Sequence, residues 1–380
     1  MKIRNILLSL CAVVALNVVS AELPDSVLRR CAARMLMVGF RGDSITEKSD
    51  AARYVRDLGV GGIILFDIDL TGSAKIGSRN ITEKSRLARL TADLRREAHR
   101  NLLIAIDQEG GTVRRLRPEY GFLPAVSAEY LGNINNRDTT FAHAERIAAE
   151  MVEVGLNVNL APSVDVNVNP ECPVVGALHR SFSGDTAVVV QNAAWTIEAH
   201  RRHGVLCALK HFPGHGSSAS DSHYGLTDVT DTWQPYELAP FRELIRSGEV
   251  DMIMTAHIFN RKIDPDYPAT LSKIFIDGIL RRDLGFDGVV LTDDMYMQGI
   301  IDNYSVEDAI VLAINAGADM IVAGNNISTG YEPERPFQLV DMIVEAVKDG
   351  RIPIERLLES NRRIDNLMKK LQAYIPANCP

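Results

Sequence analysis

The sequence contains little that suits a nucleic-acid-binding or a membrane-spanning protein. No run of lysine and arginine is longer than two residues, as at Arg95–Arg96, and the formal net charge of the 380-residue chain is −8. Both observations argue against a nucleic-acid partner. After residue 19, no segment approaches the roughly 18 uninterrupted apolar residues of a membrane span. We therefore expect a globular protein that does not span a membrane. We also expect it to be a monomer.

Cysteine is also scarce, and the thiols are scattered. Apart from Cys11, the chain has only Cys31, Cys172, Cys207 and Cys379. Four distant cysteines are a weak disulfide framework for a chain of this size, and Cys207 lies within an apolar run. The sequence therefore predicts no particular pairing among them.

The first residues have the pattern of a cleaved export signal. Lys2 and Arg4 precede an apolar run at residues 6–19, and residues 19–21 have the small side chains of a signal-peptidase site. The pattern predicts a signal peptide over residues 1–21, a mature chain over residues 22–380, and export to the periplasm or the extracellular space. A lipid anchor on Cys11 is the alternative, which is disfavoured because the residues before it, 8–10, lack the expected small side chain.

Eight short runs, rich in apolar residues, recur along the remaining chain. Nearly continuous apolar residues are typical of parallel strands that are buried on both faces. The eight runs are Met35–Phe40, Gly62–Phe66, Leu102–Ile106, Asn157–Leu160, Val205–Leu209, Met252–Thr255, Val289–Thr292 and Met320–Ala323.

Helical patterns lie between these runs. Leu87, Leu90 and Leu94 share one helical face, a capping box at Ser305 opens a helix that Gly317 closes, and residue 272 can cap a helix that extends to residue 280. No linker or low-complexity segment divides the chain. Strand and helix repeated eight times predict an α/β fold, a single-domain (β/α)8 TIM barrel, with an open doubly wound sheet as the alternative.

Ionisable side chains crowd the segment KHFPGHGSSASDSHYGL, residues 210–226. Its glycine, serine and proline content predicts a loop at the surface. Asp221 and His223 stand two residues apart, so in an extended segment the carboxylate can orient the imidazole for proton transfer. Simple turn and capping roles are one alternative, and a zinc or manganese site is another, although the spacing matches no common metal motif.

Charged side chains follow five of the eight predicted strands. In a TIM barrel the active site lies at the carboxyl ends of the strands. The residues at these positions are Asp107, Asp165 with Arg180, Lys210 with His211, His257 and Asp293. Their placement predicts a polar pocket at that end of the barrel.

Five motifs together resemble glycoside hydrolase family 3, and in particular its single-domain, NagZ-like β-N-acetylglucosaminidases. The motifs are IDQEGG at residues 106–111, HRSFSG at 179–184, KHFPGHG at 210–216, DSH at 221–223 and LTDDM at 291–295. The resemblance covers residues 30–370. It departs from the family pattern at His179, where an aspartate is usual, and at Ser217-Ser218, where Asp-Thr is common.

The resemblance implies a retaining β-N-acetylhexosaminidase that acts on peptidoglycan fragments (muropeptides) or other glycans with terminal N-acetylglucosamine. It implies that Asp293 is the nucleophile and that Asp221 and His223 form the acid/base dyad. It also implies that the sugar hydroxyls are bound by Asp107, Arg180, Lys210 and His211, with no metal or other cofactor.

Other polar residues near these motifs receive different interpretations. We expect Asp294 to be a structural hydrogen-bonding residue and His215 to hold the loop. Glu109 is an alternative nucleophile, but its EGG context favours a turn. Asp165 and His257 could line the pocket or anchor the backbone. Tyr296 and Met297 could form an apolar wall, although core packing is the favoured interpretation.

Other functions remain open at this point. A β-glucosidase of the same family is disfavoured because those enzymes usually take their acid from a later domain. A phosphorylase is a second variant, since a histidine acid/base tolerates an incoming phosphate better than a carboxylate would. A catalytically inactive sugar-binding protein is the alternative of another class, and the presence of Asp293, Asp221 and His223 argues against it.

Overall fold

The computed structural model of the chain describes residues 23–70, 72, 74–222, 225–327 and 330–374. Eight parallel strands close into a barrel in the order β1-β10-β9-β7-β5-β4-β3-β2. Their bounds are β1 Leu36–Val38, β2 Gly62–Ile64, β3 Leu103–Ile106, β4 Val158–Asn159, β5 Leu206–Phe212, β7 Met252–Thr255, β9 Val289–Asp294 and β10 Met320–Ala323. Because β1 pairs with β10, the sheet has no free edge, and the alternative of an open doubly wound sheet is wrong.

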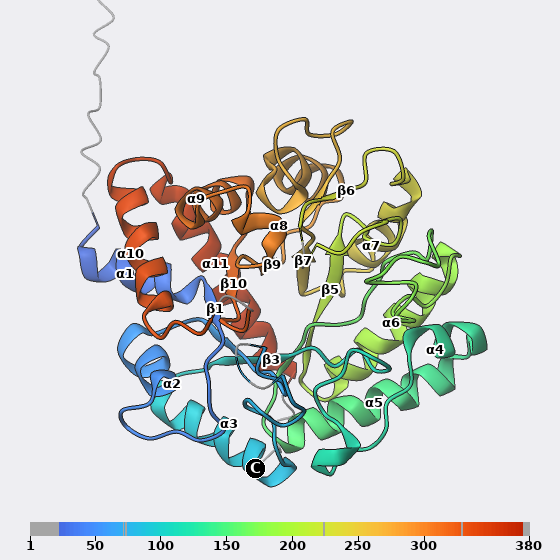
Figure 1. Ribbon diagram of the computed structural model, residues 1–380, viewed down its shortest axis with the longest axis horizontal. Coiled ribbons are helices and arrows are strands. Elements are labelled where there is room, and N and C mark those ends of the chain that lie inside the picture. Colours follow the sequence, from blue (N-terminus) through green and yellow to red (C-terminus); the bar gives the residue numbers. More distant parts are fainter. Residues whose placement is uncertain (1–22, 71, 73, 223–224, 328–329, 375–380) are drawn as a thin grey trace, which may run out of the picture.

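Helices surround the strands on the outside (Figure 1). The α-helices are α1 Asp25–Arg34, α2 Asp50–Ala52, α3 Lys84–Ala98, α4 Ala128–Ile134, α5 Arg137–Glu153, α6 Thr186–Arg202, α7 Ala239–Arg246, α8 Gln298–Ile301, α9 Val306–Ala316, α10 Arg335–Lys348 and α11 Ile354–Tyr374. Two π-helical segments are η1 Arg53–Leu58 and η5 Ile274–Asp283, and three 3₁₀ turns are η2 Pro118–Tyr120, η3 Pro235–Leu238 and η4 Ala269–Leu271. A second, two-stranded parallel sheet joins β6 Thr227–Asp228 to β8 Ile258–Phe259.

The local signals in the sequence explain several of these elements. The Ser305 hydroxyl accepts a hydrogen bond from the Asp308 amide at 3.0 Å, and Gly317 ends α9 with a φ of 120°. The Ser272 hydroxyl likewise accepts from the Phe275 amide at 3.1 Å, at the start of a helix that is π-helical and runs three residues further than predicted. Leu87, Leu90 and Leu94 are buried on one face of α3, as expected.

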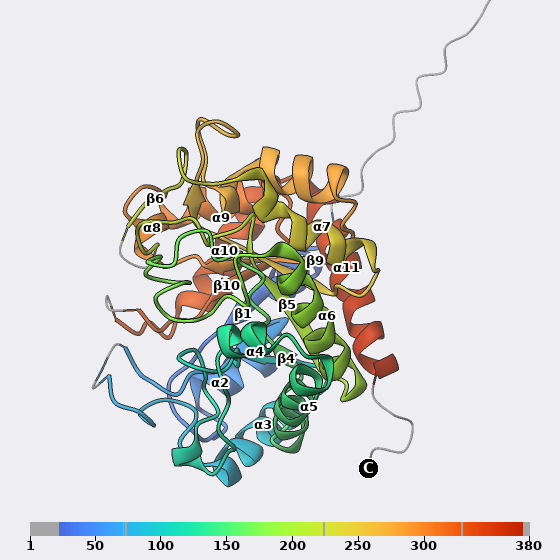
Figure 2. The same cartoon turned by 90° about the vertical axis from the view of Figure 1, so that its right-hand side faces the viewer.

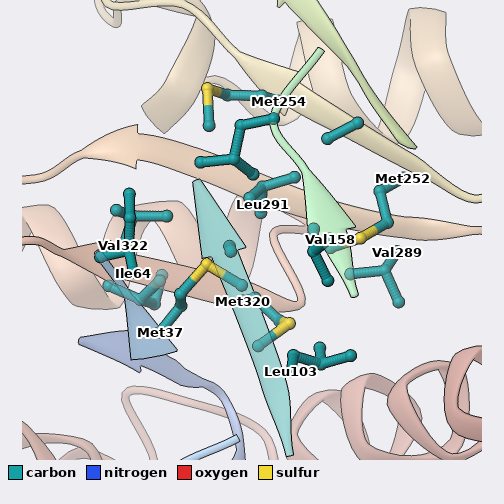
Figure 3. Packing of buried hydrophobic residues seen from close by; sticks show 14 of the residues in the cluster. Met37, Ile64, Leu103, Val158, Met252, Met254, Val289, Leu291, Met320 and Val322 are labelled. Atoms are coloured by element: carbon teal, nitrogen blue, oxygen red, sulfur yellow. The ribbon is translucent and has the colours of Figure 1, made fainter. Parts of the chain in front are cut away.

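The barrel interior is filled with apolar side chains from alternate strand positions (Figure 3). Met252 and Met254 from β7, and Met320 from β10, lie there with residues of the neighbouring strands, and each is exposed by 4% or less. Side chains two positions apart on a strand share one face, so this alternation places one set inside the barrel and the other set against the helices.

Two strands extend further than the apolar pattern predicts. β5 continues through Lys210, His211 and Phe212, and β9 continues through Asp293 and Asp294. The predicted runs ended before these polar residues. Their backbone nevertheless pairs with neighbouring strands, as at Phe212 with Thr255, so residues expected just beyond the strands belong to the barrel itself. The loops that follow the strands, together with β6 and α8, lie on the left of the barrel in Figure 2.

Several predictions fall on residues outside the described part of the chain. They are the signal peptide at residues 1–21, Cys11, Cys379 and His223. No disulfide joins Cys31, Cys172 and Cys207 to one another. Within the described residues, no helix has both the length and the apolar character needed to cross a membrane.

Candidate active site

Lys210 lies at the centre of a buried charge cluster at the carboxyl end of the barrel. Its amine is 2.7 Å from Asp107 Oδ1 and 2.7 Å from Glu109 Oε1, and its side chain is only 2% exposed. Burial alone would lower the pKa of Lys210, but the two carboxylates outweigh it and the net direction is upward. The amine is therefore a fixed positive charge between β3 and β5.

Glu109 also pairs with Arg180, which comes from the long loop between β4 and α6. The pair is bidentate, with Nε to Oε2 at 2.9 Å and Nη2 to Oε1 at 2.7 Å. Burial opposes ionisation of Glu109, but Arg180 and Lys210 lower the pKa of the carboxyl to about 2. Such a two-point contact fixes the plane of the guanidinium as well as its position.

The predicted turn at Glu109 is confirmed, but the side chain also takes part in the charge cluster. The turn exists, because Gly110 and Gly111 have φ values of 103° and 57°, but the Glu109 side chain reaches into the site and is 5% exposed. Glu109 stands two positions after Asp107, and that spacing was the signal that could have found it. Arg115 is a second residue that sequence reasoning missed, with Nη2 3.2 Å from Asp107 Oδ2.

Asp165 orients His211 and anchors the loop that follows β5. Its Oδ2 is 2.7 Å from His211 Nδ1, and its Oδ1 accepts the backbone amides of His211 at 3.2 Å and His215 at 2.7 Å. Burial alone would raise the pKa of Asp165, but the hydrogen bonds that it accepts from His211 and from the His215 amide hold it well below its usual range. Of the two roles considered, these contacts correspond to backbone anchoring.

The other ring nitrogen of His211 faces Arg180, with Nε2 3.3 Å from Nη2. Arginine can only donate, so this contact requires Nε2 to accept and Nδ1 to carry the proton toward Asp165. The described structure therefore brings Asp107, Arg180, Lys210 and His211 into one hydrogen-bonded cluster, and their role in sugar binding stays a prediction.

The expectation that the loop after β5 lies at the surface is wrong for its first half, because residues 211–218 are buried. The loop between β4 and α6 covers it, and Asn169 donates hydrogen bonds to the carbonyls of Gly216 and Ser218, both at 3.0 Å. A Cβ on Gly216 would lie 1.8 Å from the Val166 carbonyl oxygen, so only glycine permits this close contact.

His215 holds the same loop from within. Its Nδ1 is 2.8 Å from Ser218 Oγ, and its Nε2 is 3.3 Å from Ser222 Oγ. These contacts agree with the interpretation of His215 as a loop-holding residue, and they involve one of the two serines that depart from the family pattern. The other departure, His179, is 59% exposed and pairs with Glu129 on α4 at 2.7 Å.

Asp293 and Asp294 end β9 in different environments. Asp294 accepts the backbone amides of Tyr296 and Gly324, both at 3.0 Å, and burial together with the nearby charge of Asp293 raises its pKa to about 6. These contacts agree with the expected structural role and connect β9 to β10. One Asp293 oxygen accepts the Asp294 amide at 2.8 Å.

His257 lies beneath this turn. It is fully buried, with Nε2 2.9 Å from the Asp294 carbonyl oxygen and Nδ1 2.9 Å from Thr270 Oγ1, so it anchors backbone. Tyr296 and Met297 are also buried, at 9% and 5% exposure. Their burial fits the interpretation of core packing. Among the residues that the structure describes, no cluster of three or more His, Cys, Asp or Glu could hold a metal ion.

The Glycosyl hydrolase family 3 N terminal domain matches residues 27–367. Beta-hexosaminidase A of Pseudoalteromonas piscicida is 35% identical over 79% of this chain and 53% of its own length. Beta-hexosaminidase of Tolumonas auensis is 34% identical over 70% of this chain and 76% of its own length. The chain thus spans about half the length of the first of these relatives.

Solved structures are similar over most of the chain. A glycoside hydrolase family 3 beta-N-acetylglucosaminidase from Paenibacillus is 35% identical, with a TM-score of 0.81 over 93% of this chain and 64% of that one. Beta-N-acetylhexosaminidase from Beutenbergia cavernae is 27% identical, with a TM-score of 0.78 over 90% of this chain and 98% of that one. The predicted TIM barrel is confirmed, and the names of these relatives agree with the predicted glycosidase class.

Burial of His215 gives a pH-dependent stability that can be measured. Burial lowers the pKa of His215 to about 4 in the folded protein, whereas an unfolded histidine titrates near pH 6.5. As pH falls below 6.5, the unfolded chain gains a proton that folded His215 does not, so stability is lost. This difference is about 2 kcal/mol between pH 7 and pH 5.

We expect His215→Gln to lose less stability than the wild type over this interval, measured as the free energy of unfolding in urea at both pH values. Comparison with the wild type is needed because the raised pKa of Asp294 acts in the opposite sense. An equal acid loss in the two proteins would show that His215 is not the titrating group.

Proposed function

Because this chain belongs to glycosyl hydrolase family 3, we propose that it is a retaining β-N-acetylhexosaminidase. It removes terminal β-linked N-acetylglucosamine from peptidoglycan fragments or other glycans. The observation that carries the proposal is the cluster of Asp107, Arg180, Lys210 and His211 at the end of the barrel that also bears Asp293. The relatives named above support it. Export to the periplasm or the extracellular space stays a prediction, as do the monomeric state and the absence of a nucleic-acid partner.

Asp293 acts as the nucleophile in this mechanism. It attacks the anomeric carbon while the bond to the leaving oxygen breaks, which gives a glycosyl-aspartate intermediate. A nucleophile of this kind has to be anionic and precisely aimed. The short side chain, its place at the end of β9 and the hydrogen bond from the Asp294 amide support this assignment.

His223 acts as the acid and then as the base, with Asp221 as its orienting carboxylate. The imidazole donates its proton to the leaving oxygen, and afterwards it removes a proton from the water that hydrolyses the intermediate. A histidine suits both steps because its ordinary pKa is about 6.5, close to ambient pH. Asp221 is half-buried in the loop after β5, two residues before His223.

The sugar-binding cluster supplies position rather than proton transfer. Asp107 accepts hydrogen bonds, whereas Lys210 and Arg180 can only donate them. A sugar hydroxyl group can both donate and accept, so it can form hydrogen bonds with either kind of side chain. Glu109 fixes the position of Arg180, and Asp165 fixes the position of His211. Fixed donors and acceptors of this kind align the anomeric carbon with the nucleophile.

The activity is tested with p-nitrophenyl glycosides in the presence and absence of phosphate. We expect release of p-nitrophenol from the β-N-acetylglucosaminide, little release from the β-glucoside, and the same rate with phosphate as without. Formation of a sugar 1-phosphate would identify a phosphorylase. Preference for the glucoside would indicate a β-glucosidase, and sugar binding without turnover would indicate a binding protein.

The nucleophile is tested by substitution and by labelling. Asp293→Ala should reduce turnover at least about 10³-fold while keeping sugar affinity, and Asp294→Asn should reduce it less. A fluorinated glycosyl inhibitor should label the peptide that contains Asp293, as detected by mass spectrometry. A label on Glu109, or a small and equal loss in both variants, would contradict the assignment.

The acid is tested by changing the leaving group. Protonation matters most for the basic alkoxide of a natural disaccharide and least for an activated phenolate. His223→Ala should therefore reduce kcat/KM for disaccharides far more than for p-nitrophenyl substrates, and Asp221→Ala should show a milder form of the same effect. An equal loss for both classes would make His223 a binding residue.

A further inference from the structure

Ser222, which lies between Asp221 and His223 in the sequence, is held on two sides. Its hydroxyl is 3.3 Å from His215 Nε2, and its carbonyl oxygen accepts the backbone amide of Gly299 at 3.2 Å. The residue is only 3% exposed. The first contact ties this segment to the first, buried half of the same loop, and the second ties it to α8.

Gly299 leaves no room for a side chain on its Ser222 side. A Cβ there would lie 3.0 Å from the Ser222 carbonyl oxygen and 2.9 Å from the Gly225 carbonyl oxygen. Both neighbours are backbone atoms, so neither can move away by a simple side-chain rotation. The φ of Gly299 lies outside the left-handed region, so the restriction is one of space and not of backbone conformation.

The turn that carries Gly299 is itself fixed to the end of β9. The Met297 amide donates to the Asp294 carbonyl at 3.0 Å, and the Ile300 amide donates to the Met297 carbonyl at 2.9 Å. His257 Nε2 lies 2.9 Å from the same Asp294 carbonyl oxygen. Gly299 is therefore held at a defined place six residues after Asp293.

We propose that Gly299 is a positioning residue that sets the distance between the segment bearing the acid/base dyad and the strand bearing the nucleophile. This inference rests on the proposed roles of Asp293, Asp221 and His223. The bare glycine lets the carbonyl groups of Ser222 and Gly225 approach α8 directly. A methyl group there pushes the segment away from β9 and leaves Asp293 in place.

The test is Gly299→Ala, assayed on a disaccharide and on the p-nitrophenyl glycoside. Because misplacement by less than 1 Å is costly, we expect kcat/KM to fall about tenfold or more for the disaccharide and less than about threefold for the aryl substrate. Gly225→Ala is the matched control. It adds the same methyl group to the loop, where no atom of the described residues beyond the adjacent ones lies within 4 Å, and should keep both rates.

Labelling by the fluorinated inhibitor, whose leaving group needs no acid, should remain at the wild-type rate in Gly299→Ala. This separates the inference from the proposed function. Absence of labelling and turnover in the wild type would reject the proposed function, whereas equal losses for both substrates in Gly299→Ala alone would reject the positioning role.

Ser222→Ala gives a second test that introduces no new atoms and applies even if Gly299→Ala fails to fold. It removes the hydroxyl that faces His215 but keeps the carbonyl that faces Gly299. We expect a smaller loss that is again greater for the disaccharide. A disaccharide-specific loss of about tenfold or more in this folded variant would show that the His215 contact, and not the Gly299 contact, sets the position of the segment, and would overturn the inference.

Discussion

Charge balance in a buried space is the constraint on which the site depends. Lys210 and Glu109 are 2% and 5% exposed, so either charge alone would be costly in the interior. Asp107 and Arg180 complete the balance. Because these groups come from the loop after β3, from β5 and from the loop between β4 and α6, their pairing also fixes three separate parts of the chain. Removing one member would leave its buried partners only partly compensated, which is more disruptive than losing a surface ion pair.

The loop after β5 is also fixed by buried polar contacts, in this case by hydrogen bonds. Asp165 receives the amides of His211 and His215, and the His215 ring then reaches the hydroxyl groups of Ser218 and Ser222. The segment at Asp221 is therefore positioned by a series of hydrogen bonds that begins at a buried carboxylate.

The sequence predicted the barrel well because parallel strands buried on both faces must be nearly continuous in apolar residues. The prediction failed where the cost of burying a polar residue is offset by a partner that is far away in the sequence. β5 and β9 extend through Lys210, His211 and Asp294, whose ion-pair or hydrogen-bond partners lie far away in the sequence. The glycines after Glu109 indicated a turn, and they did not indicate that Glu109 and Asp107 both pair with Lys210. The loop at residues 211–218 looked exposed because its composition cannot show that another loop, near Asn169, covers it.

The methionines inside the barrel have a consequence for oxidative damage. Met37, Met252, Met254 and Met320 come from β1, β7 and β10, and none is exposed by more than 4%. A peroxide can reach these thioethers only when the strands separate, and the sulfoxide that forms is polar and no longer suits the interior. Sulfoxide accumulating at these four positions would therefore record how often the barrel opens, and each opening that ends in oxidation would make reclosure less favourable.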